Sequence, residues 1–159
     1  ALASGWRSVQ RRIVEDALAR GQGAAGLALA RQLAMITYGS AEEFEARFNR
    51  VIGENGRSDL DDYLLARGQA YATAAPALRW LSLSEAIDRF SVDPARIAAP
   101  TTLVGCPTDQ LAPLADMQNL ARLLPHCRAF KLLPSIYGHD AFLKEPSQLK
   151  PILEEALHG

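Results

Sequence analysis

The chain has 159 residues, of which 48% are hydrophobic and 22% are charged, and its 17 Lys and Arg against 18 Asp and Glu leave a formal net charge of −1. These values predict one ordinary globular domain or a large piece of one. No stretch is long and apolar enough for a transmembrane span, no secretory leader is recognisable, and the balanced charge offers no basic surface for nucleic acid. We therefore expect neither a membrane nor a nucleic acid as partner.

The residues from Trp6 to about residue 90 predict a run of helices. The first helix is indicated by apolar residues that recur at three-to-four spacing: Trp6, Val9, Ile13, Ala17 and Leu18. Gly21 and Gly23 are expected to end it. A second helix, expected to be buried on most sides, carries Leu27, Leu29, Leu33 and Ile36 among small alanines.

Three further helices are predicted in this region. Ser40 stands three residues before Glu43, which is the capping-box spacing of a helix start, and Phe44, Phe48 and Ile52 would form the buried face of that helix. Ser58 is a plausible N-cap for a fourth helix that reaches about Arg67. A fifth helix is marked by Leu78, Leu81, Ser84 and Ile87.

After Pro94–Pro100 the pattern changes to α/β. Thr101–Val104 is a short β-branched and apolar run closed by Gly105, as in a strand buried on both faces. A helix from Pro113 to Leu124, a second strand over Ala129–Leu133 and a closing helix over Pro146–Leu157 follow. The two strands are expected to be parallel neighbours, and because two strands do not make a stable parallel sheet, they should be the end of a larger one. The predicted division is a helical region over 1–92 and an α/β part over 93–159.

Two candidate catalytic residues follow the two predicted strands. Asp109 comes just after the first strand, and His139 comes a few residues after the second. Reactive groups of α/β folds lie at the carboxyl ends of parallel strands, and an acid followed by a histidine matches the order Ser, Asp, His of α/β-hydrolase triads. The alternative is that Asp109 caps a turn and His139 caps a helix.

The remaining residues of catalytic type give weaker signals. His126 follows the end of a helix and His158 is next to the terminus, so both are expected to be structural or without a role. The Gly21–Gly26 stretch matches a dinucleotide-binding pattern by its letters, but a helix rather than a strand precedes it. Cys106 and Cys127 have no zinc-site spacing and are too few for a disulfide scaffold, which predicts a cytoplasmic protein that needs no metal.

Arg31 lies on the otherwise apolar second helix, with Tyr38 two turns further on roughly the same side. A guanidinium in such a place needs a partner, either an internal carboxylate or an anionic ligand. The alternative is a salt bridge at the rim of the core together with a packed tyrosine.

Four stretches resemble the homoserine O-acyltransferase family: GLALARQLAMITY (Gly26–Tyr38), SAEEF (Ser40–Phe44), Asp109 with LAPLAD (Leu111–Asp116), and YGHDAFL (Tyr137–Leu143). Members of this family are α/β-hydrolase-fold enzymes that acylate the hydroxyl of homoserine, or in some branches serine, from acetyl-CoA or succinyl-CoA. The resemblance covers nearly the whole chain but only the C-terminal half of the family's length.

The resemblance implies a role for each matched position. Asp109 and His139 become the acid and base of a catalytic triad, and Arg31 becomes the clamp on the amino-acid carboxylate. Tyr38 and Asp140 would be further substrate contacts, with Asp140 facing the substrate ammonium or, alternatively, serving as a helix-start carboxylate. The helices from about Trp6 to Phe90 would form a lid inserted between two strands of the sheet, and the family's dimers form through this lid.

Some features depart from the family pattern. Gly39 stands where the family usually has Arg, and the Tyr71–Trp80 region lacks the usual Asp-Ala-Asn-Ser-Tyr-like stretch. No Gly-x-Ser-x-Gly nucleophile elbow occurs, and the candidate serines lie on no strand-to-helix elbow: Ser4, Ser8, Ser40, Ser58 and Ser135. The acyl donor and the amino-acid acceptor therefore stay open.

We interpret the chain as the C-terminal part, lid included, of an α/β-hydrolase-fold homoserine or serine O-acyltransferase of methionine or cysteine biosynthesis. It would use acyl-CoA as co-substrate, without a cofactor, in a ping-pong Ser-His-Asp mechanism, and would form a homodimer through the lid helices. The 159 residues alone are expected to be inactive. The alternatives are an α/β-hydrolase that transfers the acyl group to water, and a non-catalytic helical dimerisation fragment.

Overall fold

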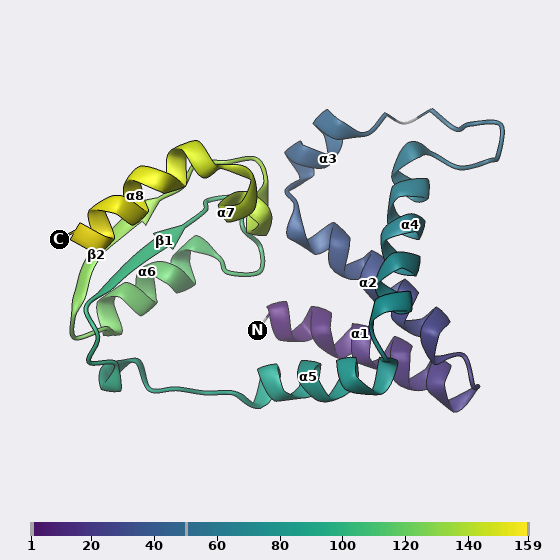
Figure 1. The fold of residues 1–159 in the computed structure, drawn as a ribbon, viewed down its shortest axis with the longest axis horizontal. Coiled ribbons are helices and arrows are strands. Elements are labelled where there is room, and N and C mark those ends of the chain that lie inside the picture. Colours follow the sequence, from purple (N-terminus) through teal and green to yellow (C-terminus); the bar gives the residue numbers. More distant parts are fainter. Residues whose placement is uncertain (1, 50, 159) are drawn as a thin grey trace. The chain divides into compact units, whose positions relative to one another are not determined.

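The computed structural model describes residues 2–49 and 51–158, which fold as two compact units (Figure 1). The first unit takes the chain up to Thr37 together with Phe44–Phe90, and the second takes Tyr38–Glu43 together with the chain from Ser91. The division into a helical lid region (1–92) and an α/β part (93–159) stays a prediction. The compact units differ from this division at two places, because Tyr38–Glu43 and the residues Ser91 and Val92 belong to the second unit.

All five predicted helices of the first unit are present. They are α1 (Leu2–Ala19), α2 (Gly23–Tyr38), α3 (Ala41–Arg47), α4 (Asp59–Ala74) and α5 (Ala77–Arg89). Helix α4 begins at the predicted cap, where the Ser58 side chain and Asp61 form a complete capping box, and it runs seven residues beyond the expected end.

The prediction that α3 extends to Ile52 is wrong. The helix ends at Arg47, and Ile52 is exposed. The Asn49 side chain accepts a hydrogen bond of 2.9 Å from the Val51 amide. Such a local side-chain bond competes with the helical pattern and turns the chain away from it.

The core of the first unit forms where α1 and α2 meet. Val14, Leu27 and Ala30 are almost fully buried there. Gly26 allows the close approach, since a Cβ at this position would lie 2.3 Å from the Ala17 Cβ. The small residues of α2 thus face the core. The expectation that this helix is buried on most sides holds for most of its residues, while Leu29 and Ile36 are exposed.

An ion-pair cluster joins the two ends of the first unit. Asp88 of α5 is held by Arg7 of α1 at 2.5 Å and by Arg11 of α1 at 2.6 Å. Partial burial works to raise the pKa of Asp88, but the hydrogen bonds from the two arginines outweigh it and hold that pKa below its ordinary value. The contact fixes α5 against α1.

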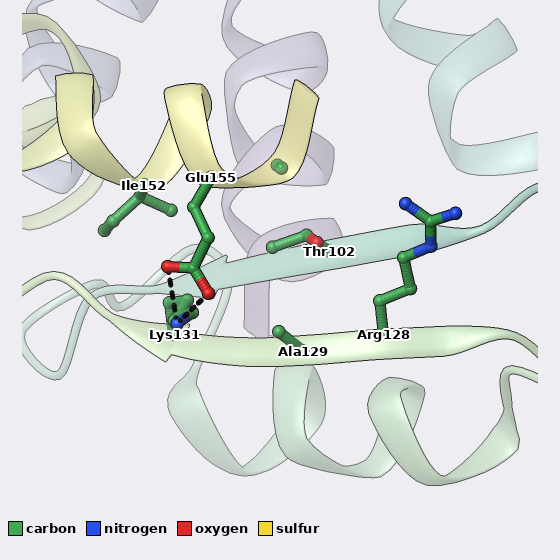
Figure 2. Close-up of a pocket in the computed structure, with 7 residues that line it drawn as sticks. Thr102, Arg128, Ala129, Lys131, Ile152 and Glu155 are labelled. Carbon is green, nitrogen blue, oxygen red and sulfur yellow. Dashed lines mark hydrogen bonds and ion pairs between the residues drawn. The ribbon is translucent and has the colours of Figure 1, made fainter. Parts of the chain in front are cut away.

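The second unit contains a two-stranded sheet. Strands β1 (Thr101–Gly105) and β2 (Cys127–Leu132) pair in parallel, with Leu103 opposite Phe130 and Gly105 opposite Leu132. The prediction of parallel neighbours is confirmed, although β2 begins two residues earlier and ends one residue earlier than expected. Helices α6 (Leu114–Leu123) and α8 (Pro146–His158) lie on opposite faces of the sheet (Figures 1 and 2).

Three short elements complete the second unit. They are η1 (Pro94–Arg96), η2 (Gly138–Asp140) and α7 (Ala141–Lys144). Over the part of the chain that the structure describes, no helix combines the length and the apolar character needed to cross a membrane.

Candidate active site

The candidate acid and base lie at the carboxyl ends of the two strands. Asp109 is in the loop after β1, and His139 is in η2, after β2. Because the strands are parallel, both loops leave the sheet at the same edge. The Nδ1 atom of His139 lies 2.9 Å from Asp109 Oδ2. The expected hydrogen-bonding distance is therefore confirmed, while the catalytic roles of the two residues stay predictions.

The Asp109 carboxylate is oriented by its own loop. Its Oδ1 atom accepts hydrogen bonds from the backbone amides of Leu111 at 2.8 Å and Ala112 at 3.0 Å, which leaves Oδ2 for the imidazole. The Asp109 side chain is 10% exposed and that of His139 is 41% exposed. A nearly buried carboxylate thus holds one edge of an imidazole whose remaining surface is open to a further group, which is the arrangement that a general base requires.

Tyr38 belongs to this site as well. Its ring centroid lies 6.0 Å from that of His139. Gly138 makes this packing feasible, because its φ is +57° and a Cβ there would lie 2.7 Å from the Tyr38 carbonyl oxygen. The segment after Tyr38 is hydrogen-bonded to both loops that carry the candidate acid and base. Ser40 Oγ donates to the Ile136 carbonyl, and Gln110 Nε2 donates to the Gly39 carbonyl at 3.2 Å.

Asp140 lies in a small charged group next to His139. Lys144 Nζ is 3.7 Å from Asp140 and 2.5 Å from the carboxylate of Glu43, so the lysine binds Glu43 more closely. Lys144 also lies over the Tyr137 ring, 4.8 Å from its centroid. The capping-box spacing of Ser40 and Glu43 is realised in part, since the Glu43 amide donates to Ser40 Oγ at 3.1 Å. The Glu43 and Lys144 contact was not predicted, because 101 residues separate the two along the chain.

A pocket of about 200 Å³ adjoins the acid and base. Asp109 and His139 lie in its wall, and its other lining is mostly apolar: Val104, Cys106, Ala112, Leu133, Gly138, Ala141, Phe142 and Leu149. Cys106 is the one lining residue of reactive type that the sequence analysis gave no role at this site. A pocket with this lining suits an apolar ligand group held beside an imidazole.

A second pocket, of about 170 Å³, lies between the sheet and α8, and neither Asp109 nor His139 lines it (Figure 2). Its charged lining includes Lys131, whose Nζ is 2.8 Å and 2.9 Å from the two carboxylate oxygens of Glu155. No side chain of this lining is a histidine, cysteine or serine. We assign no chemistry to it.

Arg31 is placed within the first unit. Its guanidinium lies over the ring of Tyr71 of α4, 4.8 Å from the centroid, a contact that the sequence analysis did not consider. The proposed clamp on a carboxylate is untested by this geometry and stays a prediction.

The other candidates do not join the site. His126 and His158 are exposed, and the His126 carbonyl accepts a hydrogen bond from Thr101 at the start of β1. Among residues 2–49 and 51–158, no group of three or more His, Cys, Asp and Glu side chains is arranged to hold a metal ion.

A carboxylate and imidazole pair at the ends of adjacent parallel strands is characteristic of α/β-hydrolase-fold proteins. Comparison with solved structures shows this fold. The chain matches homoserine O-acetyltransferase from Bacillus anthracis with a TM-score of 0.79 and 14% identity, over 98% of this chain and 49% of that one. It matches homoserine O-acetyltransferase from Staphylococcus aureus with a TM-score of 0.76 and 21% identity, over 99% of this chain and 47% of that one. It matches the esterase E22 with a TM-score of 0.77 and 16% identity, over 94% of this chain and 49% of that one.

The sequence relatives of this chain among curated proteins include homoserine O-acyltransferases. The chain is 44% identical to homoserine O-succinyltransferase of Xanthomonas campestris pv. campestris over 98% of its length. It is 31% identical to homoserine O-acetyltransferase of Mycobacterium leprae over 83% of its length. This similarity identifies the chain as related to the homoserine O-acyltransferase family, as the sequence motifs predicted. The chain spans 43% and 38% of the lengths of these two relatives. No family model matches it.

Proposed function

We propose that this chain is the part of an acyl-CoA-dependent O-acyltransferase that carries its acid and base, and that the acceptor is the hydroxyl of homoserine or serine. The observation that carries the proposal is the 2.9 Å contact between His139 Nδ1 and Asp109 Oδ2. Both residues line the pocket at the carboxyl ends of the strands. The names and the similarity of the sequence relatives support the choice of an acyltransferase.

The mechanism follows from the orientation of the imidazole. In this mechanism the Asp109 carboxylate accepts the Nδ1 proton of His139, so Nε2 is the basic atom. Nε2 takes the proton of a serine hydroxyl, the serine oxygen attacks the thioester carbonyl, and the thiolate of CoA leaves with that proton. The acceptor hydroxyl then gives its proton to Nε2 and its oxygen attacks the acyl-serine carbonyl. The ester bond to the serine breaks, and Nε2 returns the proton to the serine oxygen, which restores the free serine. The sequence contains no nucleophile elbow, so we place this serine outside these residues, and we expect the 159-residue chain alone to be inactive.

The substrate contacts are assigned from the family resemblance. Arg31 would bind the acceptor carboxylate, Asp140 its ammonium group, and Tyr38 would lie beside the reacting hydroxyl. The exposed position of Leu29 and Ile36 on α2 supports our proposal that these helices form a dimer interface, because such side chains favour burial. We further propose that the protein acts in the cytoplasm, in methionine or cysteine biosynthesis, without a metal or other cofactor. The unbridged Cys106 and Cys127 are consistent with a reducing compartment.

The test uses the full-length protein. CoA release and O-acyl amino acid are measured with acetyl-CoA and succinyl-CoA, each with homoserine and with serine. We expect a burst of CoA release followed by turnover that depends on the amino acid. Asp109→Asn should lower kcat by about 10⁴-fold, as loss of the correct imidazole tautomer does in serine enzymes, and His139→Ala should abolish the burst.

The control is His126→Ala, which changes an exposed histidine and should leave both phases intact. Release of free carboxylic acid at the same rate with and without amino acid would identify a hydrolase instead. Full activity of His139→Ala would refute the proposed base.

A further inference from the structure

The hydroxyl of Thr108 lies between the two loops that carry the candidate acid and base. Thr108 directly precedes Asp109 in the loop after β1. Its Oγ1 atom donates a hydrogen bond of 2.6 Å to the carbonyl of Ser135 and accepts one of 3.2 Å from the amide of Gly138. Both partners lie in the loop that leads to His139. One side chain therefore connects the two catalytic loops at two points.

The Thr108 hydroxyl has three polar neighbours, which match the hydrogen bonds that it can form. A threonine hydroxyl has one proton to donate and can accept two bonds. The proton is directed to Ser135, the Gly138 amide supplies one accepted bond, and the Cys106 thiol is 3.3 Å from the same oxygen. Gly138 is buried, so its amide would lose a partner that water cannot easily replace if the hydroxyl were absent.

The position of the connection matters for the imidazole. Gly138 is the residue before His139, and its left-handed backbone, with φ at +57°, directs its amide to Thr108. On the other loop, Asp109 follows Thr108 without an intervening residue. A shift of either loop at this connection therefore moves Nδ1 and Oδ2 relative to each other, and hydrogen bonds weaken steeply with distance and angle.

We propose that Thr108 is a positioning residue for the Asp109 and His139 pair, and that its hydroxyl sets the spacing at which Oδ2 holds the Nδ1 proton. The importance of this spacing for activity rests on the proposed function. Thr108 does not contact the substrate or the reacting atoms in the proposed mechanism. It acts by keeping His139 in the tautomer with the proton on Nδ1 and the basic nitrogen directed to the nucleophile.

The test compares variants of the full-length protein. Thr108→Val keeps the shape of the side chain and removes both bonds, whereas Thr108→Ser keeps the hydroxyl. Thr101→Val is the matched control, because it removes the same kind of hydroxyl, one that donates to the Ala99 carbonyl at an exposed position. The fraction of His139 with the proton on Nδ1 is measured by ¹⁵N NMR of the resting protein, and the rate of the CoA burst is measured alongside.

For Thr108→Val we expect the Nδ1-protonated fraction to fall and the burst rate to fall about 10- to 100-fold, the scale of an ångström misplacement of a catalytic group. The KM for acyl-CoA should change less than about threefold, because a tautomer change acts on the chemical step. Thr108→Ser should restore the tautomer and most of the rate, and Thr101→Val should behave as the wild type. If Thr108→Val does not fold, Thr108→Ala, which leaves room for a bridging water, should show the same changes to a smaller degree.

An unchanged tautomer and burst rate in the valine variant, or a serine variant as slow as the valine variant, would overturn the proposal. The proposed function and the positioning role of Thr108 can be refuted independently. A wild-type protein that does not transfer acyl groups refutes the proposed function, whereas the NMR measurement still decides whether Thr108 positions His139.

Discussion

Replacing Lys144 with Met should destabilise the second unit more than replacing its partner Glu43 with Gln. Lys144 Nζ lies 2.5 Å from the Glu43 carboxylate, whose side chain is only 7% exposed, whereas the lysine side chain is 31% exposed. The two ends of this ion pair therefore differ in their access to water. The variant that leaves the buried charge behind should be the less stable one.

The size of the effect follows from this difference. Removing one partner of a fully buried ion pair costs about 3–5 kcal/mol. Because Lys144 is about one-third exposed and partly screened by water, we expect Lys144→Met to lower the free energy of unfolding by about 2 kcal/mol. Glu43→Gln should lower it by about 1 kcal/mol, since the released ammonium group can turn to water and the amide oxygen still accepts a hydrogen bond. The double variant should be more stable than Lys144→Met alone, because it leaves no buried charge.

Urea unfolding, followed by circular dichroism and by a probe in the second unit, measures these values. Lys131→Met is the matched control. It breaks a lysine and glutamate pair of similar length between the sheet and α8 (Figure 2), in which the lysine is about as exposed as Lys144 but the glutamate side chain is 65% exposed. An ion pair with a carboxylate this exposed contributes at most about 1 kcal/mol. A Glu43→Gln variant less stable than Lys144→Met, or a double variant whose loss equals the sum of the two single losses, would refute the reasoning.

Three further outcomes are expected. Asp88→Asn should lower the free energy of unfolding more at neutral pH than in acid. The arginines of α1 hold the pKa of Asp88 in the folded protein below its ordinary value. Their stabilising contribution is therefore complete above the pKa of the unfolded carboxyl and is lost as the pH falls through the lower folded pKa. Unfolding curves across this pH range would contradict this if the difference between variant and wild type stayed constant. Gly138→Ala should cost about 2 kcal/mol, because alanine is strained at a φ of +57° and its Cβ would meet the Tyr38 carbonyl, and a urea midpoint equal to that of the wild type would disprove this. In the full-length protein, Arg31→Leu should lower kcat/KM for the amino acid by about 10- to 100-fold and leave the CoA burst intact, which follows from the loss of about 1.5–3 kcal/mol of charge-assisted hydrogen bonding. A burst reduced in parallel with turnover would instead show that Arg31 supports the fold.

The sequence by itself determined the elements and their order. Apolar spacing and capping residues such as Ser58 identified every helix of the first unit, because these signals act within a few residues of chain. The two strands were equally recognisable as short apolar runs. The Asp109 and His139 contact followed from their places just after parallel strands, since the ends of such strands converge at one edge of a sheet.

Only the tertiary structure decided which faces are covered and which side chains meet. Leu29 and Ile36 are as apolar as Leu27, yet they are exposed because the small residues of α2 face α1. The contact of Lys144 with Glu43 and the bonds of Thr108 to the His139 loop join residues far apart in the sequence. Periodicity and capping describe the chain over a turn or two, whereas contacts of this kind depend on how whole elements are brought together, and no local pattern of residues carries that information.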